Sequence, residues 1–337
     1  MNTNDIRVNA KKNLNGSCKV CKICNGIACA GEVPGMGGAG TGQTFINNIE
    51  ALKKIQLKLF TLHDAKNPQM NIKVFGNEID APILVAPITG SNLNFGGYLT
   101  ESEYANIVVE GAKESNLMAM TGDTAKPEFY KFGLDAINEF GSGIPTIKPR
   151  NIEQIIEKIR LAEDIKVPAI AIDMDGAGLI TMALHGQPVG PKTKSELEHI
   201  VQSTKLPVIL KGIMTPEEAR IAVNAGAKGI VISNHGGRVL DSVVGVADVI
   251  ESIVDEVKGE IMIFADSGIR SGIDVYKYLA LGVDCVLVGR PIVIAAVGGK
   301  KEGVVNLLDQ MKKELYKTMI LTGCKEISDI NRDKLIK

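Results

Sequence analysis

Tryptophan is absent from the 337 residues of the chain, and aromatic residues make up only 4% of it. Neither sign of charge dominates, because the chain has 38 Lys and Arg residues and 39 Asp and Glu residues, which gives a net charge of -1. Such a chain has no basic footprint for nucleic acid and no polybasic patch for a membrane surface. Long apolar runs are missing as well, since no stretch approaches the ~20 apolar residues of a membrane span.

Residues 1–16 are polar and lack the apolar core of a secretory signal, so we expect a cytoplasmic protein. What the chain does have is a globular composition, with 45% hydrophobic and 23% charged residues. This composition excludes a disordered chain, a coiled coil and a collagen-like fibre. Chemistry on a small molecule is the function class that remains.

Eight short apolar runs alternate with helix patterns from Ala81 onward, and each run ends in small or polar residues. The runs span residues 83–86, 117–120, 144–147, 167–172, 207–210, 229–232, 261–265 and 285–288. Clear helix patterns cover residues 151–162, 215–225 and 273–281. Eight such units, spaced roughly 25 to 35 residues apart, favour an α/β fold of the (β/α)₈ TIM-barrel type over an open flavodoxin-like sheet.

We expect three segments along the chain. Residues 1–70 form a cysteine- and glycine-rich extension with a helix over residues 45–59. Residues 71–325 form the barrel, which begins with a hairpin over residues 71–79 that plugs its bottom and ends with a closing helix over residues 304–321. Residues 326–337 form a tail.

Active sites of such barrels lie at the C-terminal ends of the strands, so the residues after each apolar run carry the functional signal. Residues 233–238 follow the sixth run and read Ser-Asn-His-Gly-Gly-Arg. A histidine and an arginine three residues apart can place a general base and a fixed cation at one small substrate. Glycines paired with arginines follow the seventh and eighth runs, at residues 266–270 and 289–290, and predict an anion cradle for a phosphorylated cofactor or substrate.

Residues 205–291 carry a family resemblance. They contain LPVILKGIMTPEEARIAVNAGAKGIVISNHGGRVLD and FADSGIRSGIDVYKYLALGVDCVLVGRP. This stretch resembles the C-terminal half of the FMN-dependent α-hydroxy-acid oxidases and dehydrogenases, the family of glycolate and lactate oxidase. Residues 81–89 and 169–175 match moderately, and the first 70 residues hardly match. The resemblance implies FMN as cofactor, oxidation of a small 2-hydroxy acid to the 2-oxo acid, and a homo-oligomer, most simply a tetramer.

The same resemblance implies roles for individual residues. His235 is the active-site base, Asp175 the carboxylate that steadies it, Arg238 the clamp on the substrate carboxylate, and Lys211 the cation beside the flavin N1/O2 edge. The residues implied to contact FMN are Pro87, Ile88, Thr89, Thr121, Lys211, Asp266, Gly268, Arg270, Gly289 and Arg290. We also expect Lys148, Asp173 and Ser233 to contact the cofactor.

The chain also departs from the family pattern. The family has a second arginine after the fourth strand, whereas Asp175 is followed by Gly-Ala-Gly-Leu-Ile-Thr-Met. The third strand of the family carries a Gln and a Tyr, and here Lys148 is either a substitute cation or a loop residue. Two other functions therefore stay open: a non-redox FMN enzyme of the type 2 isopentenyl diphosphate isomerase kind, and a flavin electron-transfer protein.

Four cysteines crowd the extension in the pattern Cys18-x2-Cys21-x2-Cys24-x4-Cys29. This spacing suits a [4Fe-4S] cluster or a Zn(Cys)₄ site, and the alternative is four reduced thiols without metal. A cluster would give the flavin a one-electron outlet. The following GMGGAG at residues 35–40 formally matches a dinucleotide fingerprint, but no strand precedes it, so we expect a glycine lid over the barrel mouth instead.

Overall fold

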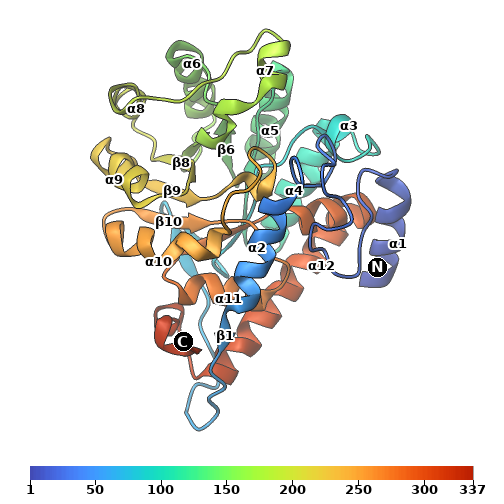
Figure 1. Ribbon diagram of the computed structural model, residues 1–337, viewed down its shortest axis with the longest axis vertical. Coiled ribbons are helices and arrows are strands. Elements are labelled where there is room, and N and C mark those ends of the chain that lie inside the picture. The colour runs from blue at the N-terminus through green and yellow to red at the C-terminus, as the bar shows by residue number, and fades with distance from the viewer. Residues whose placement is uncertain (337) are drawn as a thin grey trace.

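Eight parallel strands close into a barrel in the computed structural model, which describes residues 1–336 (Figure 1). The hydrogen-bonded order is β10-β11-β4-β5-β6-β7-β8-β9, and the last strand pairs with the first. Each strand contains or overlaps one of the eight predicted apolar runs, which confirms the TIM-barrel prediction. The strands are β4 Ile83–Val85, β5 Met118–Thr121, β6 Ile144–Ile147, β7 Ile170–Asp173, β8 Val208–Ile213, β9 Gly229–Ile232, β10 Met262–Ala265 and β11 Cys285–Val288.

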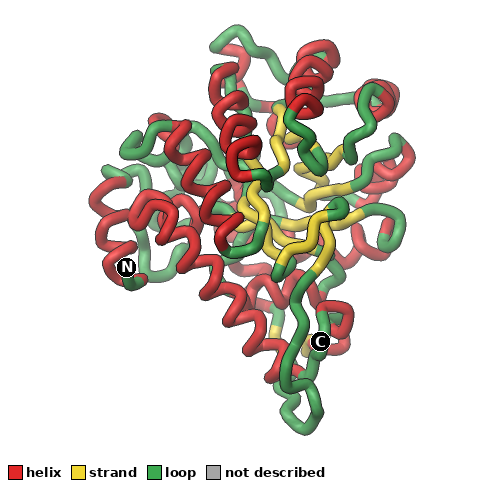
Figure 2. Tube along the Cα trace, turned by 180° about the vertical axis from the view of Figure 1, so that it is seen from behind, coloured by secondary structure: helices red, strands yellow, loops and turns green. Residues whose placement is uncertain are grey.

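Helices surround the strands on all sides, so nearly every strand residue is buried (Figure 2). Continuous apolar strands are expected where helices cover both faces of a parallel sheet. Asn151 and Thr215 cap α6 and α9 by accepting hydrogen bonds from the N–H groups of Gln154 and Glu218. The covering helices are α4 Glu101–Glu114, α5 Pro127–Phe140, α6 Ile152–Asp164, α8 Lys194–Gln202, α9 Pro216–Asn224, α10 Val246–Val257, α11 Gly272–Ala280 and α12 Arg290–Thr322.

Two predicted helices have different bounds in the structure. Helix α2 spans Gln43–Lys54 rather than residues 45–59, because the chain turns at Ile55 into β1 Gln56–Leu57. Helix α12 begins at Arg290, well before residue 304, and Lys300 interrupts it with a φ of +50°. The last barrel strand therefore runs almost directly into a helix instead of a loop.

The polar N-terminus forms a helix that the sequence pattern did not indicate. Helix α1 spans Thr3–Asn13 and lies along α12, far from it in sequence (Figure 1). The contact depends on Gly298, because a Cβ there would approach the Ile6 carbonyl oxygen to 2.0 Å. Asn9 also donates a hydrogen bond to the Gly298 carbonyl at 3.2 Å. Packing against α12, rather than amphipathic periodicity, thus stabilises α1.

The predicted hairpin is present as β2 Ile72–Val74 and β3 Asn77–Ile79. Phe75 in its turn stacks on Phe264 of β10, with ring centroids 6.2 Å apart, and so reaches into the bottom of the barrel. At the other end of the chain, β12 Leu335–Ile336 pairs with β1. The three-segment division stays a prediction, and Lys337 at the end of the predicted tail lies outside the described residues.

Among the described residues, no helix combines the length and the apolar character needed to cross a membrane.

Candidate active site

A cavity of about 560 Å³ lies at the C-terminal ends of the barrel strands. Its size is typical of sites for small molecules and cofactors. Residues within, at the end of or directly after each of the eight strands contribute to its wall, as the barrel architecture requires. These include Pro87, Gly122, Lys148, Asp173, Lys211, His235, Asp266 and Gly289.

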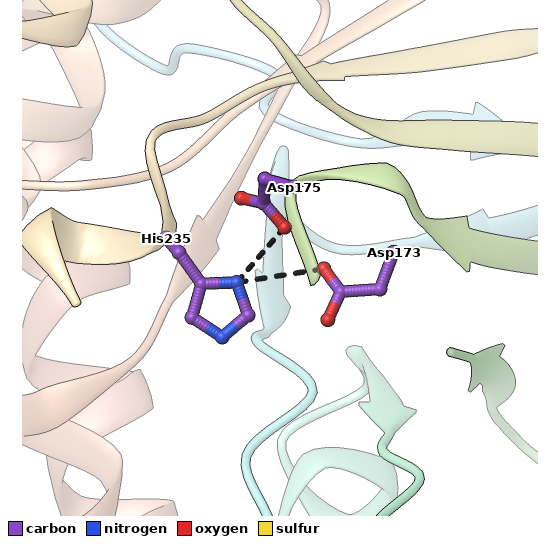
Figure 3. Close-up of side chains that lie close together, drawn as sticks. All are labelled: Asp173, Asp175 and His235. Atoms are coloured by element: carbon purple, nitrogen blue, oxygen red, sulfur yellow. Dashed lines mark hydrogen bonds and ion pairs between the residues drawn. The ribbon is translucent and has the colours of Figure 1, made fainter. Parts of the chain in front are cut away.

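His235 and two carboxylates form the centre of the site (Figure 3). His235 Nδ1 lies 2.9 Å from Asp175 Oδ1 and 3.6 Å from Asp173 Oδ1. The carboxylates come from the end of β7 and from the 3₁₀ turn over Met174–Gly178 that follows it. A carboxylate that accepts the Nδ1 proton fixes the tautomer of the ring, so Nε2 is left as the proton acceptor.

A backbone detail brings the carboxylate and the histidine together. Gly212 lies in β8 with a φ of +103°, and a Cβ there would come within 2.6 Å of the Cβ and backbone nitrogen of Asp175. Glycine tolerates this conformation and leaves the room that Asp175 occupies. His235 itself has a φ of +57°, which is uncommon for a residue other than glycine and typical of a functional turn.

Lys211 is buried and lies between the carboxylates. Its Nζ is 2.9 Å from Asp173 Oδ1 and 3.4 Å from Asp175 Oδ2. Burial acts to lower the pKa of Lys211, but Asp173, Asp175 and Asp266 together raise it above its ordinary value. Lys211 therefore stays a permanent positive charge at the floor of the cavity.

Lys148 lines the cavity and pairs with Asp173 through its Nζ. Burial acts to raise the pKa of Asp173, but Lys148 and Lys211 outweigh it and hold that pKa well below the ordinary value. Burial raises the pKa of Asp175. Asp173 is thus the firmly ionised carboxylate, and its charge offsets that of Lys148, so Lys148 is not an unpaired cation.

Arg238 differs from the lysines in having no acidic partner among the described residues. Its guanidinium donates hydrogen bonds to the carbonyls of Gly35 and Gly37 and, at 2.8 Å, to Asn94 Oδ1. Burial lowers the pKa of Arg238 to about 10. A buried cation that is held only by neutral acceptors is a favourable site for the carboxylate of a ligand.

Two further arginines, Arg270 and Arg290, form a second anion site next to Arg238, since Arg238 and Arg290 both donate hydrogen bonds to the Gly37 carbonyl. The guanidinium of Arg290 stacks on the Phe45 ring, 3.8 Å from its centroid. Burial, with Arg238 and Arg270 nearby, lowers the pKa of Arg290 to about 9. Arg270 leaves Nε and Nη2 buried without a hydrogen-bond partner within the described chain. These unsatisfied donors fit a phosphate group, which is the group that FMN would present.

Most of the predicted cofactor contacts line this cavity. Two do not: the Thr121 hydroxyl faces Gly133 of α5, and the Ser233 hydroxyl donates to Asp266 Oδ2 at 2.9 Å. Asp175 lies behind His235 rather than in the wall. The predicted contacts that line the cavity are Pro87, Ile88, Thr89, Lys148, Asp173, Lys211, Asp266, Gly268, Arg270, Gly289 and Arg290.

Several residues of the wall carry no motif that sequence reasoning could use. Asn94 comes from α3 Ser91–Asn94, Phe129 from α5, and His185 follows α7 Ile180–Leu184. Pro34 and Met36 come from residues 34–42, here called the glycine loop, which lies at the mouth of the barrel as predicted. The backbone carbonyls of this loop hold Arg238 and Arg290, a role that side-chain patterns do not reveal.

The four predicted metal ligands, Cys18, Cys21, Cys24 and Cys29, line a second and smaller cavity. None of them forms a disulfide. Met36 and Arg290 belong to the walls of both cavities. The structure therefore brings the four thiols together beside the main site.

Residues 35–183 and 147–337 match the family model described as FMN-dependent dehydrogenase. A peroxisomal (S)-2-hydroxyacid oxidase of Arabidopsis thaliana is 30% identical over 329 residues, covering 88% of this chain and 89% of the relative. An L-lactate dehydrogenase of Xanthobacter autotrophicus is 51% identical over 142 residues, which cover 42% of this chain and 37% of that protein.

The fold has a close counterpart among solved structures. A mandelate oxidase mutant with the C4a-OH-FMN adduct superposes with a TM-score of 0.77 at 29% identity, covering 98% of each chain.

Proposed function

Because the chain belongs to the FMN-dependent dehydrogenase family and is an oxidoreductase of 2-hydroxy acids, we propose that it converts a small acid of the lactate or glycolate kind into its 2-oxo acid. The observation that carries the proposal is the hydrogen bond of His235 to Asp175 in a cavity that also holds the unpaired Arg238. A base and a carboxylate-binding cation at one cavity are what this reaction needs.

Arg238 binds the carboxylate of the substrate. Its guanidinium is already held by Asn94 and the glycine loop, so little side-chain freedom is lost when an anion arrives. Lys148 is offset by Asp173, so we assign this carboxylate to Arg238, which is buried and held only by neutral acceptors. The chain thus uses one arginine where the family pattern has two.

His235 removes a proton from the substrate at Nε2. Asp175 keeps the Nδ1 proton in place and stabilises the positive charge that the ring acquires. When bound, FMN accepts the two electrons of the oxidation. Lys211 provides a fixed positive charge at the floor of the cavity, where it favours any negative charge that builds up there.

Arg270 and Arg290 would hold the phosphate of FMN, and Pro87, Ile88 and Thr89 after β4 would contact its ring. The proposal also includes a metal at the four cysteines, either an iron–sulfur cluster or zinc, a cytoplasmic location, and a homo-oligomer such as a tetramer.

Anaerobic reduction of the bound flavin tests the reaction. The FMN-loaded protein is mixed under argon with glycolate, the two enantiomers of lactate, and larger 2-hydroxy acids, and the loss of flavin absorbance is followed. The proposal expects at least one acid to bleach the flavin and to yield the matching 2-oxo acid. If none of them does so while dithionite still reduces the flavin, the proposed reaction is wrong.

A further inference from the structure

Four cysteine thiols line one small cavity, although none of the four residues belongs to a helix or a strand. Cys18, Cys21, Cys24 and Cys29 lie in a segment of turns between α1 and α2, yet all four line the same small cavity. They are free of disulfides. Met36, Arg290 and Ile294 complete the wall. Convergence of every cysteine in the segment is the arrangement of a metal site rather than of incidental thiols.

The segment is held in place by contacts from the rest of the chain. Arg7 of α1 donates hydrogen bonds to the carbonyls of Val20 and Cys21, at 3.0 and 2.7 Å. Val20 takes a φ of +47°, which a β-branched residue rarely adopts. In this conformation its N–H points at the Cys18 sulfur, 3.4 Å away. Backbone N–H groups directed at cysteine sulfur are among the contacts that set the properties of iron–sulfur clusters.

The separation of the sulfurs distinguishes zinc from a cluster. A tetrahedral zinc with Zn–S bonds of about 2.3 Å places its ligand sulfurs only about 3.8 Å apart. In a [4Fe-4S] cluster each cysteine binds a different corner iron, so the sulfurs lie on the order of 6 Å apart. Within residues 1–336, no three of the cysteine sulfurs come within 4.8 Å of one another. The sulfurs therefore do not form the compact group that a tetrahedral zinc requires, and the cluster, which needs a wider spacing, is the metal site we argue for.

Charge supplies an independent observation. Four thiolates around a [4Fe-4S] core leave a net negative charge, of about 2− in the oxidised state. Arg290 faces the cysteine cavity, and its own partners are the neutral carbonyls of Met36, Gly236 and Gly37. Its guanidinium is therefore available as a counter-ion to an anionic group on either side of the wall.

We infer that Cys18, Cys21, Cys24 and Cys29 ligate a [4Fe-4S] cluster that shares the wall of Met36 and Arg290 with the cofactor cavity and serves as a one-electron outlet for the flavin. Oxidation of one 2-hydroxy acid releases two electrons and two protons. The flavin takes the electron pair, and the cluster passes the electrons singly to an external one-electron acceptor protein. The supply of electrons from a 2-hydroxy acid rests on the proposed function, whereas the metal site itself does not.

The outer edge of the site lies at the molecular surface. Ile23 and Ile27, on either side of Cys24, are 67% and 64% exposed. An external protein can therefore approach the cluster from solvent without entering the barrel mouth, which the glycine loop covers.

Metal content tests the site without any assay of activity. The full chain is purified without oxygen, and iron, zinc and acid-labile sulfide are measured. We expect about four iron and four sulfide per chain, with a cluster EPR signal after reduction by dithionite. Cys24→Ser should lose most of the iron. Cys324→Ser is the matched control, because Cys324 lies in a buried network with Tyr276 and Thr322, where a hydroxyl fits.

Two results would overturn the site. One is about one zinc per chain without sulfide, and the other is neither metal above trace level. Both results are measured on the parent protein, so they remain decisive even if Cys24→Ser does not fold.

A second measurement tests whether electrons pass from the flavin through the cluster to an external protein. FMN-loaded protein is reduced with dithionite, desalted under argon and mixed with ferricytochrome c, a protein too large for the flavin cavity. We expect the parent and Cys324→Ser to reoxidise their flavin about tenfold or more faster than Cys24→Ser. Equal rates contradict the outlet while leaving the metal result in place. A chain that holds iron but takes up no FMN contradicts the proposed function instead.

Discussion

Replacement of His235 by Gln separates the position of this side chain from its ability to take up a proton. The Gln amide can still donate to Asp175 Oδ1, which lies 2.9 Å from His235 Nδ1 in the parent. An amide does not accept a proton near neutral pH, whereas imidazole does. Fold, FMN content and flavin spectrum should therefore stay as they are, and only the oxidation of substrate should fail.

The expected size of the loss follows from the role of the ring as a base. General acid–base catalysis contributes about 10²- to 10⁴-fold, which corresponds to roughly 3 to 5 kcal/mol in the barrier. Asp175 Oδ1 lies 2.9 Å from Nδ1 and leaves Nε2 as the proton acceptor, a function that the Gln amide cannot take over. We therefore expect a loss within this range.

The rate is measured by rapid mixing under argon, with the loss of flavin absorbance as the signal. His199→Gln is the control, because His199 is exposed on α8, outside the cavity wall. A His235→Gln rate within about tenfold of the parent would refute His235 as the base. Loss of FMN from His235→Gln would instead mean that the side chain supports the cofactor cavity.

Three other predictions concern the arginines and the glycine loop. Arg238→Lys should raise KM for a carboxylate substrate by about 10- to 100-fold, because one ammonium cannot replace the planar fork, and an unchanged KM in steady-state kinetics would place the carboxylate elsewhere. Arg290→Ala should raise the Kd for FMN by about 10- to 100-fold in a titration of the apoprotein. Arg160→Ala on the exposed part of α6 serves as its control, and equal affinities would remove Arg290 from the phosphate site. Asp241 accepts hydrogen bonds from the Thr41 hydroxyl and N–H, which lower its pKa to about 2, below the ordinary value of about 3.9. The ionised Asp241 therefore holds the glycine loop fully above pH ~4 and loses this hold as the pH falls toward 2. Amide hydrogen exchange in residues 34–42, corrected for its intrinsic pH dependence, should lose protection at a higher pH in Asp241→Asn than in the parent; a shared onset contradicts this role.

Local signals in the sequence were enough for the barrel and for part of the site. Each strand is a short apolar run that must be buried on both faces. The start of α9 is marked by two neighbouring residues, the N-cap Thr215 and Pro216 at the first helical position. His235 and Arg238 are close in sequence and follow one strand, so their common location could be predicted from that strand alone.

Contacts between distant parts of the chain could not be predicted from the sequence, because they form only when the barrel closes. Asp173 and Lys148 come from different strands, and their pairing, which removes Lys148 as a free cation, has no local pattern. The hydrogen bonds of Arg238 to Asn94 and Gly35 also have no local pattern in the sequence, and neither does the packing of α1 against Gly298. The chain reveals which residues are able to carry charge, bind metal or take up a proton. Barrel closure sets which of these charges are offset and which stay unpaired, because that depends on distances across the fold.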